Sequence, residues 1–376
     1  MTIFVKADMA AFFIITVSMK NIAVFVKNLT SGGAEKQSVL LAKALANAYR
    51  IHYIIFNGAK VHQKYLDMLR SDEKIAIIAF NGGLVQRYQI FVDYLKSNKI
   101  EAIFSYLSAA NVYACLAGKQ VGAKVYTGLR NAKLPLGKHL ADCFLANNLA
   151  EKAIVNCYSG KRNFVSKGFN NKKVWVIPNC FEHIKPYVEK TKKDKVHIIT
   201  VGRFVKQKDY ETAIRVVAEL RKECPNVIFN IVGYGELEKQ IRMWVRSYGI
   251  EDITNIHLNP PHIPQLLDGA DIYMSTSLFE GTSNSIMEGM NADLPIVATN
   301  VGDNEYLVEH GVNGLLCEVG DFKGISRCLI RLVKDVEERT SMGRQSKQKL
   351  QKHYSIEQFG QKYINLIEGR FNEDVG

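Results

Sequence analysis

Two glutamates eight residues apart, Glu280 and Glu288, bracket a turn rich in hydroxyl groups, Gly281-Thr282-Ser283-Asn284-Ser285. Thr282, Ser283 and Asn284 are residue types favoured at the N-cap of a helix, and the residues after them predict a helix over 284–291. A helix start presents free backbone N–H groups and the positive end of the helix dipole, which suits a phosphate. The two carboxylates could then contact a sugar and a ribose, with the phosphates held between them.

The pattern alone leaves an ordinary interpretation open. Hydroxyl-capped helices are common after the strands of α/β proteins, and acidic residues on helices are usually solvated. Three further motifs therefore support a ligand site, because each follows a predicted strand and opens a predicted helix. Ligands of α/β sheets bind beyond the carboxyl ends of the strands, where these motifs would lie.

The first motif is Asn28-Leu29-Thr30-Ser31-Gly32-Gly33-Ala34-Glu35. The glycine pair, Gly32 and Gly33, would let the backbone approach a ligand closely, and the helix behind it offers N–H groups to an anion. The motif is not the Gly-x-Gly-x-x-Gly of dinucleotide-binding enzymes, which argues against NAD.

The second motif, Val201 to Tyr210, contains two cations, Arg203 and Lys208. Both could bind a diphosphate, the arginine through its planar guanidinium and the lysine as a point charge. The third motif, Gly233-Tyr234-Gly235, ends the next predicted strand and could shape the pocket for a base. Each motif taken alone is also compatible with surface cations or a simple loop.

Strands and helices alternate on both sides of a charged segment, residues 187–195, which we interpret as a linker. Before it we predict strands at 21–27, 52–56, 75–80, 102–106, 124–128, 143–147 and 174–179, and helices at 34–48, 84–97 and 109–120. After it we predict strands at 196–202, 227–232, 271–275 and 295–298, and helices at 208–222, 235–247, 284–291, 322–335, 337–352 and 356–371. This alternation predicts two Rossmann-like α/β domains with parallel sheets, facing each other across a cleft.

Composition is typical of a globular enzyme. The 376 residues are enough for two domains, and 47% are hydrophobic and 23% charged. The seven cysteines contain no Cys-x-x-Cys pair, which argues against a zinc site and a disulfide framework and fits a reducing cytosol. The apolar run 9–17 is too short to span a bilayer. Because a second Met-Lys pair at Met19 precedes the first strand, we interpret residues 1–18 as an N-terminal extension.

The formal charge of +12 is concentrated in one part of the chain. Residues 87–175 contain 14 Lys or Arg against 4 Asp or Glu, a net charge of +10. Such a surface could meet nucleic acid, anionic lipid or a phosphorylated substrate, or could simply be solvated. No helix-turn-helix, zinc-finger or RNA-binding signature is found, which argues against nucleic acid.

Together these segments resemble glycosyltransferase family 4 (glycosyl transferases group 1), the retaining transferases with the GT-B fold. The matching segments are Gly32 to Glu35, Val201-Gly202-Arg203 with Lys208, Val232 to Gly235, Phe279-Glu280-Gly281 through Glu288, and His310 to Leu316, with Val176 to Asn179 matching the approach to the linker. The resemblance runs from about Met19 to the C-terminus, and the ordered set in the second half is its most specific part.

The resemblance implies a donor site mainly in the C-terminal domain and an acceptor site mainly in the N-terminal domain. Glu280, Arg203 and Lys208 would be catalytic, with Glu280 on the donor sugar and the two cations neutralising the departing diphosphate. The donor-binding set would be Gly32, Gly33, Gly233, Tyr234, Thr282, Ser283, Asn284, Ser285 and Glu288, with Glu288 on the ribose.

Two positions depart from the family pattern. Many relatives place a histidine in the N-terminal domain near the donor sugar, whereas the comparable stretches here contain none. Arg130 is our candidate for a related role, towards an acceptor phosphate. Asp303 stands where relatives often carry a second glycine, which leaves the local sugar contacts open.

The implied activity is a retaining, metal-independent transfer of a sugar from a nucleotide-sugar, with UDP favoured over GDP on family frequency. Attack would come from the front face within an ion pair, and no Asp-x-Asp triplet is present to bind a metal. We expect no cofactor, a glycan or polyprenyl-diphosphate-linked acceptor of a surface-polysaccharide pathway, such as capsule or lipopolysaccharide, and no nucleic acid partner. Alternatives are a GT-B sugar-nucleotide epimerase and a non-catalytic sugar-nucleotide-binding protein.

The predicted domain ranges are an extension at 1–18, an acceptor domain at 19–186, a linker at 187–195, a donor domain at 196–355 and a helix at 356–376 that packs back on the acceptor domain. The basic acceptor domain predicts peripheral contact with an anionic membrane, through Lys133, Lys138, Lys161 and Arg162. We therefore expect a cytoplasmic protein at the inner face of the cytoplasmic membrane.

Overall fold

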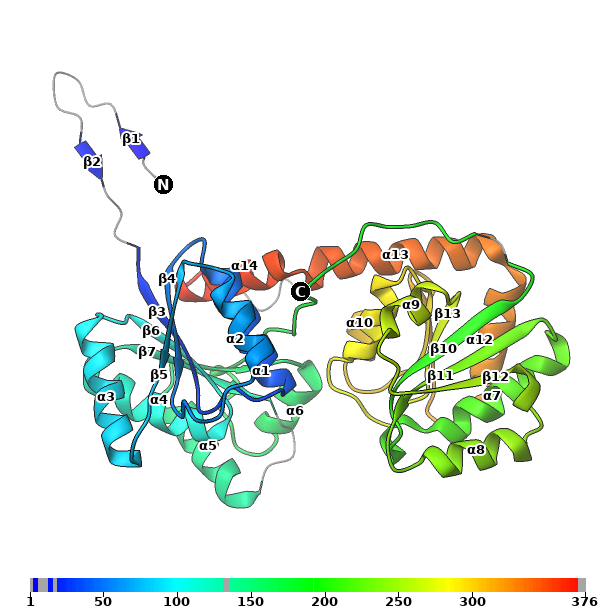
Figure 1. The fold of residues 1–376 in the computed structure, drawn as a ribbon, viewed down its shortest axis with the longest axis horizontal. Coiled ribbons are helices and arrows are strands. Elements are labelled where there is room, and N and C mark those ends of the chain that lie inside the picture. Colours follow the sequence, from blue (N-terminus) through cyan, green and yellow to red (C-terminus); the bar gives the residue numbers. More distant parts are fainter. Residues whose placement is uncertain (1–2, 6–12, 16–18, 131–134, 192, 371–376) are drawn as a thin grey trace. The chain divides into compact units, whose positions relative to one another are not determined.

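The computed structural model describes residues 3–5, 13–15, 19–130, 135–191 and 193–370. The chain divides by its contacts into two compact units (Figure 1). Unit 1 comprises Met1–Val155, Asn163–Trp175 and Gly360–Gly376, and unit 2 comprises Asn156–Arg162 and Val176–Phe359. Lys133, Lys192 and parts of the predicted ranges 1–18 and 356–376 lie outside the described residues.

Unit 1 is built on a seven-stranded sheet in the order β5-β4-β3-β6-β7-β8-β9. The strands are β3 (Asn21–Val26), β4 (Arg50–Ile55), β5 (Ile75–Ala79), β6 (Ala102–Tyr106), β7 (Lys124–Leu129), β8 (Lys152–Val155) and β9 (Val174–Val176). The pairs from β5 to β8 are parallel. Their near-continuous buried runs are typical of a sheet covered on both faces. A separate antiparallel pair joins β1 (Ile3–Val5) to β2 (Phe13–Ile15).

Helices cover both faces of this sheet. They are α1 (Gly33–Leu45), α2 (Gln63–Arg70), α3 (Leu84–Ser97), α4 (Ser108–Val121), α5 (Leu136–Asn148) and α6 (Tyr158–Val165), whose first residues group with unit 2. One face packs against α3, α4 and α5 in a single hydrophobic cluster. On the other face Ser38 of α1 is hydrogen-bonded to Tyr53 of β4. Tyr363, from the last helix of the chain, packs edge-on against Phe104 of β6, with ring centroids 5.2 Å apart.

The strand predicted over 143–147 is wrong, because these residues belong to helix α5. The segment is apolar, but the helix buries only Asp142, Leu145 and Ala146. Phe144 is 60% exposed. The apolar residues of this segment are therefore split: Leu145 and Ala146 face the core, and Phe144 faces outward. The strand β8, which we did not predict, follows at Lys152–Val155.

Unit 2 has a six-stranded parallel sheet in the order β12-β11-β10-β13-β14-β15. The strands are β10 (Val196–Arg203), β11 (Val227–Tyr234), β12 (Thr254–Leu258), β13 (Ile272–Ser275), β14 (Ile296–Thr299) and β15 (Gly314–Cys317).

The helices of unit 2 also cover both faces of its sheet. They are α7 (Tyr210–Glu223), α8 (Glu238–Ser247), α9 (Ile263–Asp268), α10 (Asn284–Asn291), α11 (Asn304–Leu307), α12 (Phe322–Lys334) and α13 (Val336–Tyr354), with 3-10 turns η1 (Lys206–Lys208) and η2 (Glu251–Ile253). One face packs against α7, α8 and α12, and the other against α9, α10 and α13. The last helix, α14 (Ile356–Ile367), begins in unit 2 and ends in unit 1.

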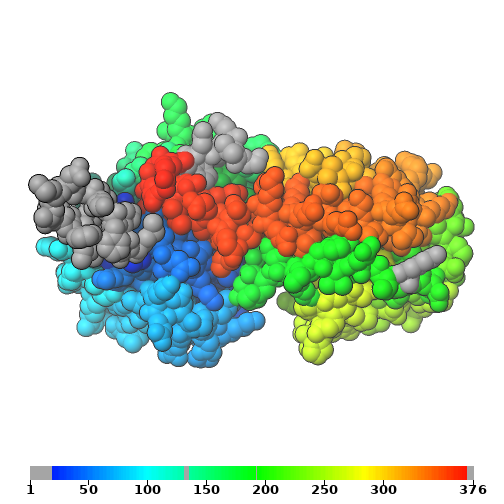
Figure 2. All heavy atoms as spheres, turned by 90° about the horizontal axis from the view of Figure 1, so that it is seen from above, coloured from blue at the N-terminus to red at the C-terminus, as the bar shows by residue number. Residues whose placement is uncertain are grey.

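The charged segment 187–195 is fastened to unit 2 where the structure describes it. Lys190 donates to the backbone of Asp268 at 2.6 Å, and Lys193 pairs with Asp271 at 3.1 Å. Just before this segment, the Lys185 carbonyl accepts from Lys347 of α13 at 3.1 Å. Figure 2 shows the chain around residue 185 lying along α13. A lysine-rich segment without apolar periodicity can therefore pack on a domain, because its lysines bind carboxylates and backbone carbonyls of unit 2.

Both sheets reverse their strand order at one point, between β3 and β6 in unit 1 and between β10 and β13 in unit 2. At such a switch point the loops after the two central strands diverge and leave a crevice at the carboxyl edge of the sheet. Within the described part of the chain, none of the helices has the length and apolar character that crossing a membrane requires.

Candidate active site

A pocket of about 390 Å³ lies at the switch point of unit 2. It brings together ten of the residues predicted from sequence: Arg203, Lys208, Gly233, Tyr234, Glu280, Thr282, Ser283, Asn284, Ser285 and Glu288. They come from the end of β10 and the turn after it, the end of β11, the loop after β13 and the first turns of α10. These segments are distant in sequence, but they line one space because the parallel strands end at the same edge of the sheet.

Lys208 and Glu280 form an ion pair inside this pocket. The Lys208 Nζ lies 2.6 Å from Glu280 Oε1, and the two side chains are only 17% and 9% exposed. The Ser277 hydroxyl donates to the same Glu280 oxygen at 2.8 Å. Because two donors converge on one oxygen, the position of this carboxylate is well defined, and the other oxygen is not engaged by either of them.

The backbone around Lys208 explains how the lysine reaches the pocket. After β10 the chain forms the turn η1, and Asp209 has a left-handed conformation with φ 46° and caps α7 by accepting from Thr212 N. Gln207 fixes this turn to the loop after β13, since its carbonyl accepts from Leu278 N at 2.8 Å and its amide donates to Phe279 O at 2.8 Å. The loops that carry Lys208 and Glu280 are therefore held together by hydrogen bonds to backbone groups.

Helix α10 begins as predicted, and Ser283 is its N-cap. The Ser283 hydroxyl accepts from Ile286 N at 3.4 Å. Thr282 instead donates its hydroxyl to the Asn156 carbonyl at 2.7 Å, within unit 2. Asn284 is exposed and Glu288 is half-buried one turn further along, and both line the pocket.

Two glycines keep the pocket walls close together. A Cβ on Gly233 would lie 1.8 Å from the Gly202 carbonyl oxygen on the neighbouring strand. A Cβ on Gly302, whose φ is 60°, would lie 2.0 Å from the Glu280 carbonyl oxygen. The requirement for glycine at these positions is thus explained by packing between strands and loops. Tyr234 stands at the pocket rim and is 57% exposed.

Asp303, the position that departs from the family pattern, has a structural role. Its carboxylate accepts from Tyr158 N at 2.6 Å and from Ser159 N at 2.8 Å, and so binds the start of α6. The rings of Tyr158 and Tyr306 stack with centroids 4.1 Å apart. These residues all belong to unit 2. The aspartate is therefore occupied by backbone N–H groups.

Several residues of the site were not predicted from the sequence. Ser277 orients Glu280, Gln207 joins the two loops, and Gly302 leaves space for the Glu280 carbonyl. Asn259 and Ile263 complete the pocket lining. Ser277 could have been found, because it ends the hydroxyl-rich run Ser275-Thr276-Ser277 at the end of a strand. The roles of Gln207 and Gly302 depend on contacts between segments that are distant in the sequence.

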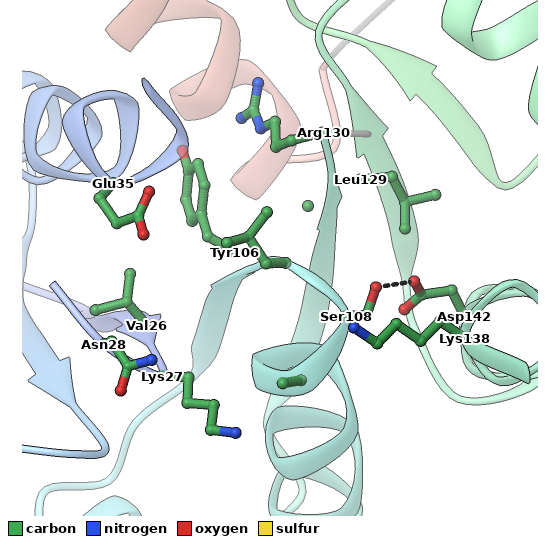
Figure 3. Close-up of a pocket in the computed structure, with 13 residues that line it drawn as sticks. Val26, Lys27, Asn28, Glu35, Tyr106, Ser108, Leu129, Arg130, Lys138 and Asp142 are labelled. Carbon is green, nitrogen blue, oxygen red and sulfur yellow. Dashed lines mark hydrogen bonds between the residues drawn. The ribbon is translucent and has the colours of Figure 1, made fainter. Parts of the chain in front are cut away.

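Unit 1 has a pocket of its own, of about 240 Å³, at the switch point between β3 and β6 (Figure 3). Arg130 lines it, with its guanidinium 4.8 Å from the centre of the Tyr106 ring. Gly32 is the N-cap of α1 and Gly33 its first residue, and neither is among the lining residues. Glu35 does line the pocket, and it accepts from the Thr30 hydroxyl at 2.6 Å.

A buried carboxylate, Asp142 of α5, also lines this pocket. It accepts from the Ser108 hydroxyl at 2.5 Å, drawn in Figure 3, and from the Asn111 amide at 3.1 Å. Burial raises the pKa of Asp142, while these two hydrogen bonds act in the opposite direction. Asp142 was not predicted as a site residue. Residues 143–147 beside it were interpreted as a strand, whereas they continue the helix that carries Asp142 into the pocket.

Two Rossmann-like units, each with a pocket at its switch point, are the architecture of the GT-B fold. Solved structures show the same fold: HepE of Anabaena in complex with UDP superposes with a TM-score of 0.77 at 18% identity, covering 93% of this chain and 100% of that one. Residues 183–349 match the family described as glycosyl transferases group 1.

Curated relatives agree with this class. An uncharacterised glycosyltransferase of Haemophilus influenzae is 26% identical over 371 residues, 93% of this chain and 100% of that protein. The UDP-Gal:α-D-GlcNAc-diphosphoundecaprenol α-1,3-galactosyltransferase of Escherichia coli is 27% identical over 183 residues, 43% of this chain and 46% of that protein. The chain thus has the GT-B fold and is similar to glycosyltransferases of group 1.

Proposed function

We propose that this protein is a retaining, metal-independent glycosyltransferase that moves a sugar from a UDP-sugar to a lipid-linked glycan of a surface-polysaccharide pathway. The observation that carries the proposal is the Lys208–Glu280 pair at 2.6 Å beside the start of α10, in a pocket that Arg203 also lines. This arrangement offers cations, helix N–H groups and carboxylates to the diphosphate and the two sugars of one donor.

The cations supply the electrostatic part of the reaction. As the bond between the donor sugar and its diphosphate breaks, negative charge grows on the leaving phosphate oxygen. Lys208 and Arg203 stabilise that charge, and the N-terminus of α10 adds its dipole. A metal would have the same task, so the presence of two cations in the pocket supports metal independence.

The carboxylates hold the donor at both ends. Glu280 accepts hydrogen bonds from hydroxyls of the transferred sugar through the oxygen that Lys208 and Ser277 do not contact. Glu288, inside α10 and beyond the turn that holds the phosphates, accepts from the ribose. Retention follows if the acceptor attacks from the face that the diphosphate leaves, with a phosphate oxygen taking the acceptor proton.

The names of similar proteins support the choice of donor and acceptor. The Anabaena structure was solved with UDP, and the Escherichia coli relative is named for the transfer of galactose from UDP-Gal to a diphosphoundecaprenol-linked sugar. In this proposal the pocket of unit 1 receives the acceptor, and Arg130 and Lys138 are two of the cations that line it and could bind an acceptor phosphate.

The test is nucleotide release from a panel of UDP- and GDP-sugars, with EDTA present, and with or without a membrane lipid extract. Extract-dependent release from one UDP-sugar, lost in Glu280→Gln, is the expected result. Release that needs an added divalent cation would contradict metal independence. Turnover of a donor without any acceptor would contradict transfer and favour an epimerase, and UDP binding without turnover under any condition would favour a binding protein.

A further inference from the structure

Two cysteines of unit 2 lie with their thiols in contact. Cys317 ends β15 and Cys328 belongs to α12, and their Sγ atoms are 3.3 Å apart, so either thiol can donate a hydrogen bond to the other. Both side chains are partly exposed, whereas four of the other five cysteines are buried. Neither residue lines the pocket of unit 2, so this thiol pair is separate from the candidate active site.

The fold brings the two thiols together. After β15 the chain turns at Gly320, whose φ is 76°, and Asp321 caps α12 by accepting from Gly324 N at 2.8 Å. Cys317 and Cys328 then pack against the same hydrophobic cluster, from the strand and from the second turn of the helix. Because the S–S bond of a disulfide is about 2.05 Å long, the Sγ atoms need to approach by roughly 1.3 Å, which side-chain rotation can supply.

The surroundings of the pair make one thiol the better nucleophile. The hydrogen bond with Cys317 and the guanidinium groups of Arg331 and Arg327 lower the pKa of Cys328 to about 7, against burial and the Asp321 carboxylate. The same hydrogen bond and burial raise the pKa of Cys317. Since the thiolate is the nucleophile in thiol–disulfide exchange, Cys328 attacks first and Cys317 second.

We propose that Cys317 and Cys328 are a redox-modification site, at which exchange with a small-molecule disulfide closes a reversible intramolecular disulfide. The Cys328 thiolate attacks one sulfur of the small disulfide, so that a mixed disulfide forms and one thiolate leaves. Cys317 then gives its proton to solvent and attacks the Cys328 sulfur, and the second thiolate leaves. Two protein thiols are thereby oxidised, and one small disulfide is reduced to two thiols, which take their protons from solvent.

The position of the pair suggests what the bond would stabilise. At the edge of the described sheet, β15 pairs with β14, and the bond would join this edge strand covalently to α12. The Cys317 carbonyl also accepts from Asn300 N at 2.7 Å, at the start of the loop whose Gly302 packs against the Glu280 carbonyl. Closing the loop 317–328 restricts the unfolded chain, so the oxidised form of unit 2 should be the more stable one.

The experiment equilibrates the full chain with mixtures of reduced and oxidised glutathione, from fully reducing to fully oxidising. Free thiols are then trapped with N-ethylmaleimide, and intact mass and peptide mapping identify the thiols that were lost. Thermal unfolding of unit 2 is followed on the same samples through Trp244, which packs against the same cluster, in a Trp175→Phe background.

The variants separate the two thiols, and the control removes an unrelated one. Cys317→Ser and Cys328→Ser each leave half of the pair. Cys143→Ser is the matched control, because Cys143 is also partly exposed but lies on α5 of unit 1. Exposure to a small oxidant is thus similar, while the neighbouring thiol is missing from the argument for Cys143.

We expect the wild type and Cys143→Ser to lose two thiols together, mapped to a bond between Cys317 and Cys328. The unfolding temperature of unit 2 should rise by about 5–10 °C on oxidation and return when dithiothreitol is added. Cys317→Ser should stop at a mixed disulfide on Cys328, and Cys328→Ser should keep Cys317 reduced.

Free Cys317 and Cys328 in fully oxidising glutathione, or a separate glutathione on each, would overturn the proposal in the wild type itself. An unchanged unfolding temperature of the bonded form would contradict the stabilising role. None of these measurements uses a sugar donor or an acceptor, so their outcome is independent of the proposed function.

Discussion

The two pockets occupy equivalent places in similar sheets, yet they are built differently. In unit 2 the buried ion pair comes from the segments that follow β10 and β13, which carry Lys208 and Glu280. In unit 1 the buried carboxylate comes from a helix, since Asp142 of α5 is held by Ser108 and Asn111 of α4. A switch point therefore supplies the crevice, while the local chain determines its chemistry.

The largest effect is expected from removing the cation of the unit 2 pair. Lys208→Met should lower kcat/KM by about 10²–10³-fold, because charge on the leaving diphosphate loses a stabilising partner. Steady-state nucleotide release measures this. Lys206→Met is the matched control, an exposed lysine of the same turn, and should stay near wild type. Equal activity of both variants would show that the pair has no part in the reaction.

The next effect concerns the support of α10. Lys347 of α13 is 1% exposed and contacts Asn291, the Lys185 carbonyl and Asp293. Lys347→Met should lower the free energy of unfolding of unit 2 by about 3 kcal/mol, since Asp293 loses its cation. Urea unfolding followed by Trp244 in a Trp175→Phe background measures unit 2. Lys352→Met, exposed on the same helix, is the control, and a similar loss there would remove the explanation.

A smaller effect is expected from the hydroxyl that orients Glu280. Ser277→Ala should lower kcat/KM about tenfold, which corresponds to one hydrogen bond to a charged group. Ser275→Ala removes a buried hydroxyl of the same run that contacts Ser277 and not Glu280. Its activity should fall less. If the two variants were equal, the orientation of Glu280 would not depend on Ser277.

The smallest effect is the pH dependence of stability that the buried Asp142 gives to unit 1. Burial raises the pKa of Asp142, so the folded state holds its proton more tightly than the unfolded chain. The resulting stabilisation is complete below the unfolded pKa of about 3.9 and is lost as pH rises through the raised folded value. Asp142→Asn has no such proton. The stability of the wild type relative to this variant should therefore fall as pH rises, and a constant difference in urea unfolding would contradict the assignment.

Much of unit 2 could be predicted from the sequence, because its site residues stand in compact motifs beside well-marked strands. Helix α10 spans the predicted 284–291, and Ser283 caps it. The role of Asp303 could not be predicted, since its partners Tyr158 and Ser159 are distant in the sequence. In unit 1 the apolar residues 143–147 were interpreted as a buried strand, because apolar residues are usually buried. Here Phe144 is exposed on helix α5, so apolar character does not indicate burial at this position.

Hydrogen exchange of the full chain with and without UDP tests the central claim most directly, because it locates the nucleotide. We expect slower exchange in residues 203–210 and 280–288 of unit 2, and no change in residues 136–148 of unit 1. Lys208→Met should weaken this protection. Protection confined to unit 1, or none at saturating UDP, would contradict the assignment of the unit 2 pocket as the donor site.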